Sequence, residues 1–137
     1  MKSSQHLEVG RIYSRKELQQ QFDIQDATIK NGIFQPRGHD SVWLFVTEQK
    51  ASDRTQYEDS LQGDDLQMDG QTMHRTDRLL IEHEARSLEL LLFHREKKTQ
   101  YENAGFRYEG RFSFLSHDES QPGKPTHFHF RRMPIQR

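Results

Sequence analysis

Apolar residues in this chain are grouped in short periodic runs separated by polar turns, and the period of each run predicts an element of structure. The run at 42–46 is β-branched and aromatic throughout, which is typical of a strand buried on both faces. A second apolar run at 88–93 predicts another strand of the same core. Aromatic residues alternate with charged or small residues over 106–114, so this strand should turn one aromatic face inward and one charged face outward. A last strand is predicted at 127–130.

Two short helices are predicted. Ser14 and Glu17 have the spacing of a capping box, in which each side chain satisfies an amide at the start of a helix, so the first helix should cover about 15–22. The second helix is predicted over 76–86, with Thr76 as its N-cap.

The order of the segments limits the fold class. With further short strands at 6–13 and 66–70, the pattern gives about six strands. A doubly wound parallel sheet needs more helices between its strands than this chain offers. The sequence therefore predicts an α+β fold with a strongly curved or barrel-like, mostly antiparallel sheet and two short helices.

Length and composition predict one domain over 1–137, with 1–6 and 133–137 as flexible ends. The chain is very polar, with a mean hydropathy of −1.05, but its apolar residues are clustered and 10% of it is aromatic, which argues against disorder. No apolar run approaches the roughly 18–20 residues that span a bilayer. No secretory signal is present, and the lack of cysteine excludes disulfides and thiolate chemistry. We therefore expect a cytoplasmic protein without a membrane partner.

Charge is nearly balanced overall but uneven along the chain. The net charge of −1 argues against a general nucleic-acid coat, which is usually clearly basic. Residues 1–70 hold 8 basic and 12 acidic residues, whereas 71–137 hold 12 basic and 9 acidic residues. This asymmetry is compatible with one basic face on a neutral protein.

An aromatic residue and a carboxylate lie close together at Tyr57 and Asp59, before a second small strand that ends at Asp69 and Gly70. Such a pair can line a pocket that stacks a flat ring on Tyr57 and accepts a ring-edge amine at Asp59. The alternative is a surface hairpin whose tyrosine packs against the protein and whose acids are solvated.

Histidines offer only weak metal motifs. His83 lies between two glutamates, but neighbours on a helix point about 100° apart, so a packed or rim histidine is favoured. His127 and His129 share one face of a strand and would need a third ligand from 117–118, across a turn. A solvent-facing pair is favoured, and we expect neither a metal site nor a cofactor.

Enzyme motifs are also weak. Asp77, Glu96 and Lys98 match the loose spacing of a superfamily of metal-dependent nucleases. That superfamily holds its glutamate and lysine on a core strand, whereas 96–98 lies at the polar end of a strand and runs into a loop. The alternative is a solvated basic hairpin that contacts phosphates. No Gly-rich phosphate loop or nucleophile elbow is present.

Taken in order, these segments resemble the SRA-like (YDG-type) domain. Versions of it occur beside HNH endonuclease domains in bacterial modification-dependent restriction enzymes and in the C-terminal region of some helicase-like restriction proteins. The resemblance extends from about Leu7 to Phe130. The matching pieces are 8–18, 31–33, 42–46, the Tyr57-Glu58-Asp59 segment, the turn ending in Gly70, 76–80, His83, 91–93 and 106–110.

The resemblance implies a PUA/SRA-like fold that grips duplex DNA and flips a modified cytosine into a pocket between two aromatics. The pocket would be formed by Tyr57 as one wall, Asp59 or Ser60 as acceptor for the cytosine amine, Met68, and the backbone at Asp69 and Gly70. The loop that enters the duplex would be Asn31, Gly32 and Ile33. Candidate phosphate contacts are Arg75, Arg78, Lys97, Lys98, Arg107 and Arg111.

Two departures from the family pattern affect the expected ligand. Met68 stands where the second aromatic wall is usual, and Ser60 and Leu61 replace the motif glycine and a bulky aromatic. A roomier pocket follows, which favours 5-hydroxymethylcytosine or a bulkier derivative over 5-methylcytosine. The implied role is the non-enzymatic reader of a bacterial defence system, with its nuclease in a separate domain or subunit. Two alternatives stay open, the small nuclease described above and a PUA-like module that binds RNA or a nucleotide.

Overall fold

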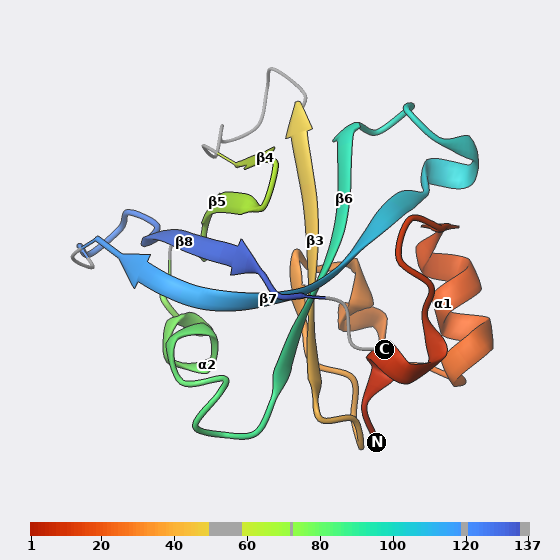
Figure 1. Ribbon diagram of the computed structural model, residues 1–137, viewed down its shortest axis with the longest axis horizontal. Helices are drawn as coiled ribbons and strands as arrows, with labels where there is room; N and C mark the ends of the chain where they lie inside the picture. Colours follow the sequence, from red (N-terminus) through yellow and green to blue (C-terminus); the bar gives the residue numbers. More distant parts are fainter. Residues whose placement is uncertain (50–58, 72, 119–120, 135–137) are drawn as a thin grey trace.

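Strand β3 (Ser41–Gln49) runs through the middle of the computed structural model (Figure 1), which describes residues 1–49, 59–71, 73–118 and 121–134. It pairs in parallel with β6 (Glu89–Lys97) and antiparallel with the short β2 (Ile33–Phe34). Residues 42–46 are buried on both faces of the sheet, as predicted. The strand predicted at 88–93 is confirmed and extends through its charged continuation to Lys97.

The remaining strands complete an open, mixed sheet. In the described part of the chain the order is β2-β3-β6-β7-β8-β5-β4, with β1 paired to β7, and every pairing except β3 with β6 is antiparallel. The α+β class and the mostly antiparallel sheet are therefore confirmed. β2 and β4 end the sheet without meeting, so closure into a barrel is not confirmed. The strands not yet given bounds are β1 (Ile12–Tyr13), β4 (Ser60–Gln62), β5 (Asp65–Asp69), β7 (Phe106–His117) and β8 (His127–Arg132).

Helix α1 (Arg15–Phe22) begins where the sequence predicts. The Glu17 amide donates to Ser14 Oγ at 3.0 Å, and the Ser14 amide donates to Glu17 Oε1 at 3.3 Å, so the capping box is complete. In the part of the chain that the structure describes, three 3₁₀ turns flank the sheet, namely η1 (Ser3–His6), η2 (Ala27–Lys30) and η3 (Glu102–Ala104).

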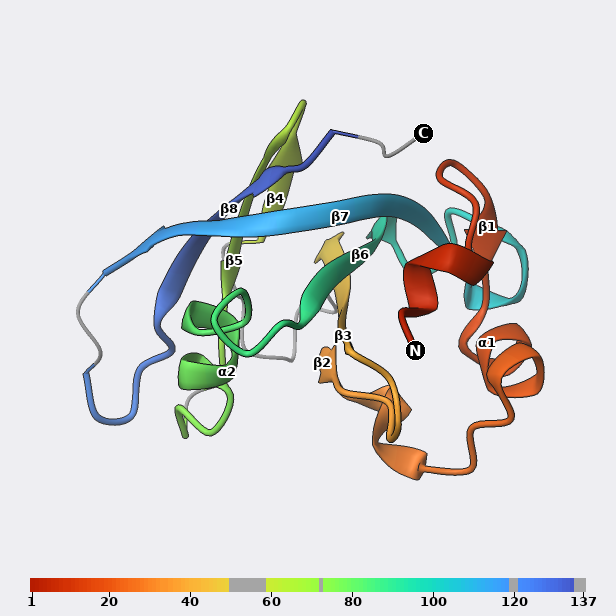
Figure 2. The same ribbon diagram turned by 60° about the horizontal axis from the view of Figure 1, so that its bottom comes forward.

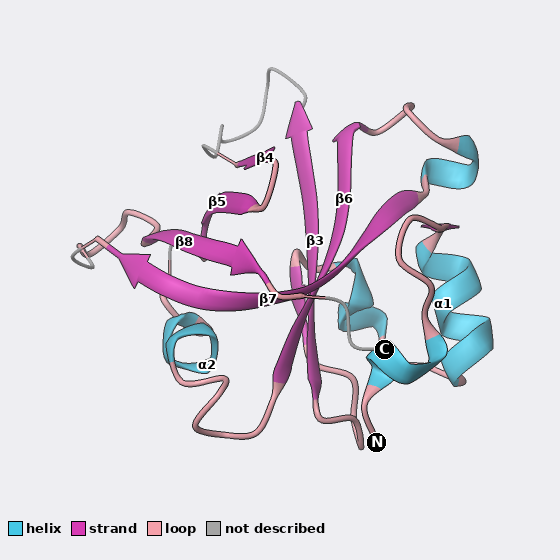
Figure 3. Cartoon of the chain, viewed as in Figure 1, coloured by secondary structure: helices cyan, strands magenta, loops and turns pink. Residues whose placement is uncertain are grey.

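Helix α2 (Asp77–Ile81) is shorter than the predicted 76–86 (Figure 3). Thr76 does not cap it, because its backbone lies outside the extended region and its hydroxyl is buried without a hydrogen-bond partner. After Ile81 the chain turns, and Ser87 takes a left-handed φ of 57° two residues before β6 begins. The predicted length was wrong because these turns redirect the chain into the sheet.

The two faces of the sheet carry separate cores. Trp43 and Leu44 are neighbours on β3 and fully buried, yet they belong to different clusters. Leu44 packs in the cluster that includes Leu80 of α2, and Trp43 packs in the cluster that includes Leu18 of α1. The two helices therefore cover opposite faces, as two views show (Figures 1 and 2).

A β-bulge changes which side of the sheet the aromatic residues of β7 face. Leu92 of β6 lies opposite Gly110, whereas the next residue of β6 lies opposite Tyr108, so Glu109 has no residue opposite it. Gly110 has φ 95°, a conformation that suits glycine. Tyr108 consequently packs in the core under α1, and Phe112 packs in the core under α2. The prediction of one aromatic face and one charged face was wrong, and Glu109 itself is buried.

The N-terminal residues, which were expected to be flexible, are bound to the sheet. The Ser3 amide donates to Ser41 Oγ at 3.0 Å, and the Ser4 hydroxyl donates to Glu89 Oε1 at 2.5 Å. These contacts involve the first residues of β3 and β6, and Ser3 is completely buried. Hydroxyl groups thus anchor a segment that has no apolar run. In the described residues, no helix is long and apolar enough to cross a membrane.

Candidate functional site

Asp59 and Asp69 meet at the open end of the β4–β5 hairpin. Asp59 precedes β4, and its Oδ1 accepts the Asp69 amide at 2.9 Å. Within the hairpin Ser60 lies opposite Gln67 and is half-buried. The structure therefore brings together two of the residues predicted for the base pocket. Tyr57, the predicted stacking wall, lies outside the described residues.

His127 adds an imidazole to this group. Its Nδ1 donates to Asp69 Oδ1 at 2.8 Å, and its Nε2 lies 3.0 Å from Gln67 Oε1. Gln67 and Asp69 share one face of β5, and β8 places His127 directly opposite Asp69. Sequence analysis missed this contact and favoured a solvent-facing histidine pair. Both histidines are partly exposed and each lies beside a carboxylate, since His129 Nε2 is 3.4 Å from Asp65 Oδ1.

Met68 faces the opposite side of β5 from this group. Its side chain is 3% exposed and packs in the core under α2, where it lies opposite Phe128. Met68 therefore lies behind the strand and does not line the exposed face that carries Asp69. Leu61 is also packed against this core.

Gly70 is held in a position that a side chain could not share. A Cβ atom there would lie 2.8 Å from Phe128 Cε2 and 3.0 Å from Asp77 Oδ1. Its amide donates to the Thr126 carbonyl at 2.9 Å. The need for glycine at this position thus comes from close packing, and its N–H is already engaged within the fold.

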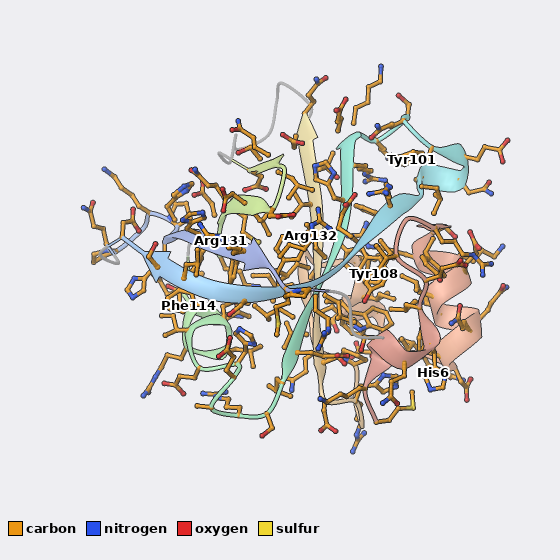
Figure 4. The ribbon with its side chains drawn as sticks, in the orientation of Figure 1. His6, Tyr101, Tyr108, Phe114, Arg131 and Arg132 are labelled. Atoms are coloured by element: carbon orange, nitrogen blue, oxygen red, sulfur yellow. The ribbon has the colours of Figure 1, made fainter. Side chains whose placement is uncertain are left out.

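Arg132 fixes the hairpin that carries this group (Figure 4). Its Nε lies 3.0 Å from Asp64 Oδ1, and its Nη2 donates to the Gly63 carbonyl at 3.2 Å, both in the β4–β5 turn. The same guanidinium contacts Glu109 at the bulge of β7, with Nη2 3.2 Å from Oε1. One side chain of β8 therefore ties the turn of the hairpin to the bulge.

The predicted duplex-inserting loop is partly exposed. Asn31 and Gly32 are exposed, whereas Ile33 is buried and pairs with Leu44 in the sheet. The Gly32 carbonyl accepts the Phe45 amide at 2.8 Å, which holds the loop against β3. Only Asn31 and Gly32 of the predicted loop are therefore presented to a partner.

The candidate phosphate contacts do not form one continuous patch. Arg75 and Arg78 are exposed in and beside α2, and Lys97 and Lys98 are exposed at the end of β6. These two groups lie on opposite sides of the molecule in two views (Figures 1 and 2).

The two candidates on β7 are less accessible than the other four. Arg107 Nη1 donates to both carboxylate oxygens of Glu109 at 2.7 Å, and this bond raises the pKa of Arg107. Arg111 is half-buried, and its Nη2 donates to the Pro134 carbonyl at 3.1 Å. A phosphate would therefore have to compete with contacts inside the fold at both positions.

Asp77 is hydrogen-bonded to neighbouring side chains within the fold. Its buried Oδ2 accepts the Thr126 hydroxyl at 2.5 Å and His74 Nδ1 at 2.8 Å, while His74 Nε2 donates to the Gln121 carbonyl at 2.8 Å. The hydrogen bond to Asp77 and, to a smaller extent, that to the Gln121 carbonyl raise the pKa of His74.

The nuclease residues Asp77 and Glu96 are not brought together, because α2 and the end of β6 lie apart (Figure 1). In the described residues, no group of three histidine, aspartate or glutamate side chains could hold a metal ion.

His83 is a packed histidine, as favoured from the sequence. It is 2% exposed, its Nδ1 donates to the Leu88 carbonyl at 2.8 Å, and its Nε2 accepts the Phe114 amide at 3.3 Å. Both ring nitrogens are therefore used to join the turns after α2 to the sheet.

Comparison with known proteins gives no family for this chain, because no family model matches it and no curated protein matches it.

Proposed function

We propose that this chain is a DNA-binding module that recognises a modified cytosine in duplex DNA by base flipping, as the reader of a modification-dependent restriction system. Two lines of support converge. The order of segments resembles SRA-like domains over most of the chain, and the structure brings Asp59 to Asp69 at the hairpin where that resemblance expects the base pocket. The open, bent sheet would be this chain's version of the PUA/SRA-like barrel. The nuclease would be a separate domain or subunit.

The contact between Asp59 and Asp69 is the observation that carries this proposal. A carboxylate held by a backbone amide has a fixed direction, and a fixed acceptor can distinguish the exocyclic amine of cytosine from the carbonyl of thymine. Arg132 restricts the hairpin further, because it is bonded both to the β4–β5 turn and to Glu109. The site would therefore be organised before DNA binds, which lowers the entropy cost of recognition.

The energies of such a site are sufficient for flipping. Extruding a base costs a few kcal/mol, and stacking on an aromatic side chain recovers about 1–3 kcal/mol per base. Tyr57 would supply the stacking, and Asp59 would supply a hydrogen bond worth about 1.5–3 kcal/mol, as is usual for bonds to charged groups. His127 and Gln67 would form part of the polar rim of the pocket, since His127 contacts the Asp69 carboxylate and Gln67 contacts His127.

The preference for 5-hydroxymethylcytosine or a bulkier derivative is part of the proposal. Met68 is packed in the core on the other side of β5, so the preference rests on the polar side chains of the exposed face and not on the side chain at position 68. Asp65, Gln67 and Asp69 are the polar side chains on the exposed face of β5. The carboxylates would accept a hydrogen bond from a 5-hydroxymethyl group, and the Gln67 amide would accept or donate one, whereas a plain methyl group can do neither.

A competition binding assay tests the proposal. One fluorescent duplex is displaced, at a fixed and stated salt concentration, by duplexes with cytosine, 5-methylcytosine, 5-hydroxymethylcytosine or glucosylated 5-hydroxymethylcytosine at a single site. We expect a modified duplex to compete at least about tenfold better than the unmodified one, because each recognised group contributes on the order of 1.4 kcal/mol or more. Equal competition by all four would refute recognition of the modification. Better competition by RNA of the same sequence would favour the PUA-like alternative.

A further inference from the structure

Two guanidinium groups pack around one aromatic ring at the α1 side of the molecule. Arg95 Cζ lies 3.9 Å from the centre of the Phe106 ring, and Arg15 Cζ lies 5.0 Å from the same centre and 4.4 Å from that of Phe45. Burial, and then the nearby charge of Arg95, lower the pKa of Arg15 to about 10. Two positive charges are thus held close together and partly shielded from solvent.

Neither of these arginines has an acidic partner in the described part of the chain. Arg15 Nε donates to the Ile29 carbonyl at 2.9 Å, and Arg95 donates to Thr47 Oγ1 at 2.8 Å and to the Ala104 carbonyl at 2.7 Å. All of these acceptors are neutral. Among the described residues, five other arginines form ion pairs with carboxylates, namely Arg78, Arg86, Arg107, Arg131 and Arg132.

This lack of a counter-charge is notable because Arg95 is only 7% exposed. A buried charge is costly unless it is paired, and cation–π contacts and neutral acceptors recover only part of the cost. In the described residues, no carboxylate therefore balances the positive charges of Arg15 and Arg95.

A cavity of about 470 Å³ opens beside Arg15, and Arg95 adjoins it only through the Ala104 carbonyl. It lies between the first turn of α1, including Arg15 and Lys16, and the η3 turn, including Asn103 and Ala104. Asn103 and Ala104 both have left-handed φ angles, 57° and 54°, and the second is unusual for alanine. This backbone conformation accompanies the bond from Arg95 to the Ala104 carbonyl, so the strained turn is coupled to the cationic pair.

One acidic side chain also lines the cavity, but it is already engaged. Glu17 Oε1 accepts the Ser14 amide in the capping box, 3.3 Å away. The first turn of a helix carries a partial positive charge that favours anions, even though the Glu17 amide is already donated to Ser14 Oγ. Together with Arg15 and Lys16, it makes the opening a site for an anion with several acceptor oxygens.

We propose that this cavity binds a phosphate group, with Arg15 and Lys16 as direct contacts and Arg95 as the supporting charge behind Ala104. The site lies across the molecule from the β4–β5 hairpin (Figures 1 and 2), so it is distinct from the proposed base pocket. The phosphate is either a phosphodiester of the DNA backbone or a free phosphate compound. Its binding does not depend on recognition of a modified base.

The test is a titration of the ¹⁵N-labelled full chain with inorganic phosphate, at constant ionic strength maintained with sodium chloride. We expect saturable shifts of the amides of Arg15, Lys16, Asn103 and Ala104, and of the side-chain Nε–Hε signals of Arg15 and Arg95. Arg15→Gln should weaken binding at least about tenfold, since it removes a charge-assisted contact. The control Arg37→Gln, at an exposed arginine outside the cavity, should leave binding unchanged.

Two outcomes would overturn the proposal. One is a set of small, unsaturable shifts spread over the surface in the wild-type chain, which requires no variant to fold. The other is equal weakening by Arg15→Gln and Arg37→Gln. A short unmodified duplex then identifies the source: if it moves the same signals and displaces phosphate, the ligand is the DNA backbone, and if only inorganic phosphate and pyrophosphate move them, it is a free phosphate compound. Neither result decides whether the chain recognises a modified base, which the competition assay tests separately.

Discussion

Glu109 and Arg132 are joined across the β7–β8 pair, with 3.2 Å between Glu109 Oε1 and Arg132 Nη2. Glu109 is the extra residue of the bulge, and Arg132 also holds the β4–β5 turn through Asp64. The residue that switches β7 between the two cores thus also anchors the hairpin that carries Asp59. The contact between Glu109 and Arg132 therefore links the bulge in the sheet to the candidate site.

Replacing Glu109 by glutamine should destabilise the protein. The carboxylate is 5% exposed and is bonded to both Arg107 and Arg132, so Glu109→Gln leaves two guanidiniums without their shared counter-charge. Breaking a buried pair costs about 3–5 kcal/mol, and because Arg107 is 43% exposed we expect a loss of about 2 kcal/mol in the free energy of unfolding. Urea denaturation measures it, with Glu102→Gln at an exposed site as the control. A loss no larger than that of the control would contradict a buried anchor.

Gly70→Ala should destabilise the junction between β5 and α2. The added methyl group would lie 2.8 Å from Phe128 and 3.0 Å from Asp77, and overpacking of this kind costs about 1–3 kcal/mol. Gly32→Ala is the matched control, because its Cβ would meet only the Phe45 carbonyl, at 3.6 Å. Thermal unfolding of both variants should show a lower Tm for Gly70→Ala alone. Since Gly32 also lies in the proposed inserting loop, its variant separates an effect on DNA binding from an effect on folding.

Stability should fall with rising pH because of His74. Its Nδ1 and Nε2 both donate, to Asp77 and to the Gln121 carbonyl, which only the protonated ring can do. The pKa of His74 is raised above 6.5 in the folded protein, so its contribution is complete below 6.5 and is lost as the pH rises through the higher folded value. His74→Asn, which tolerates the left-handed φ of 57°, should differ most from wild type at low pH.

An NMR titration of the histidine side chains checks the His74 prediction directly. We expect the pKa of His74 to lie above that of His39, because burial and the nearby N-terminal ammonium group lower the pKa of His39. The reverse order, or a difference between His74→Asn and wild type that grows with pH, would rule out the proposed role of His74.

Local features were predictable from the sequence. The capping box of Ser14 and Glu17 lies within four consecutive residues, and the apolar run at 42–46 reports burial of its own strand. Interactions over three or four positions, or a run with one period, depend little on the rest of the fold. The packed state of His83 follows from the same kind of local pattern.

Features that depend on register between distant strands could not be predicted. His127 and Asp69 are 58 positions apart, and only the pairing of β5 with β8 places them opposite each other. The bulge at Glu109 is equally hidden, because a period of two is unbroken along 106–114 while the side that each residue faces changes at the bulge. The alternation along β5 correctly predicts that Met68 points to the buried side of the strand. The sequence does not show whether that side packs in the core or lines a ligand pocket.

Asp59→Asn should remove discrimination without unfolding the hairpin. Asparagine retains an oxygen that can accept the Asp69 amide, but it replaces the second carboxylate oxygen by an NH₂ donor, which faces the cytosine amine unfavourably. If Asp59 reads a flipped cytosine, the preference for the modified duplex should fall at least about tenfold, as expected for loss of a hydrogen bond to a charged group. Non-specific affinity should stay equal or rise slightly, because one negative charge is removed near DNA. Asp23→Asn is the control, since Asp23 is exposed in a left-handed C-cap that asparagine also tolerates. An Asp59→Asn protein that keeps its full preference would show that Asp59 only holds the hairpin together, and the acceptor would then be sought on the exposed face of β5.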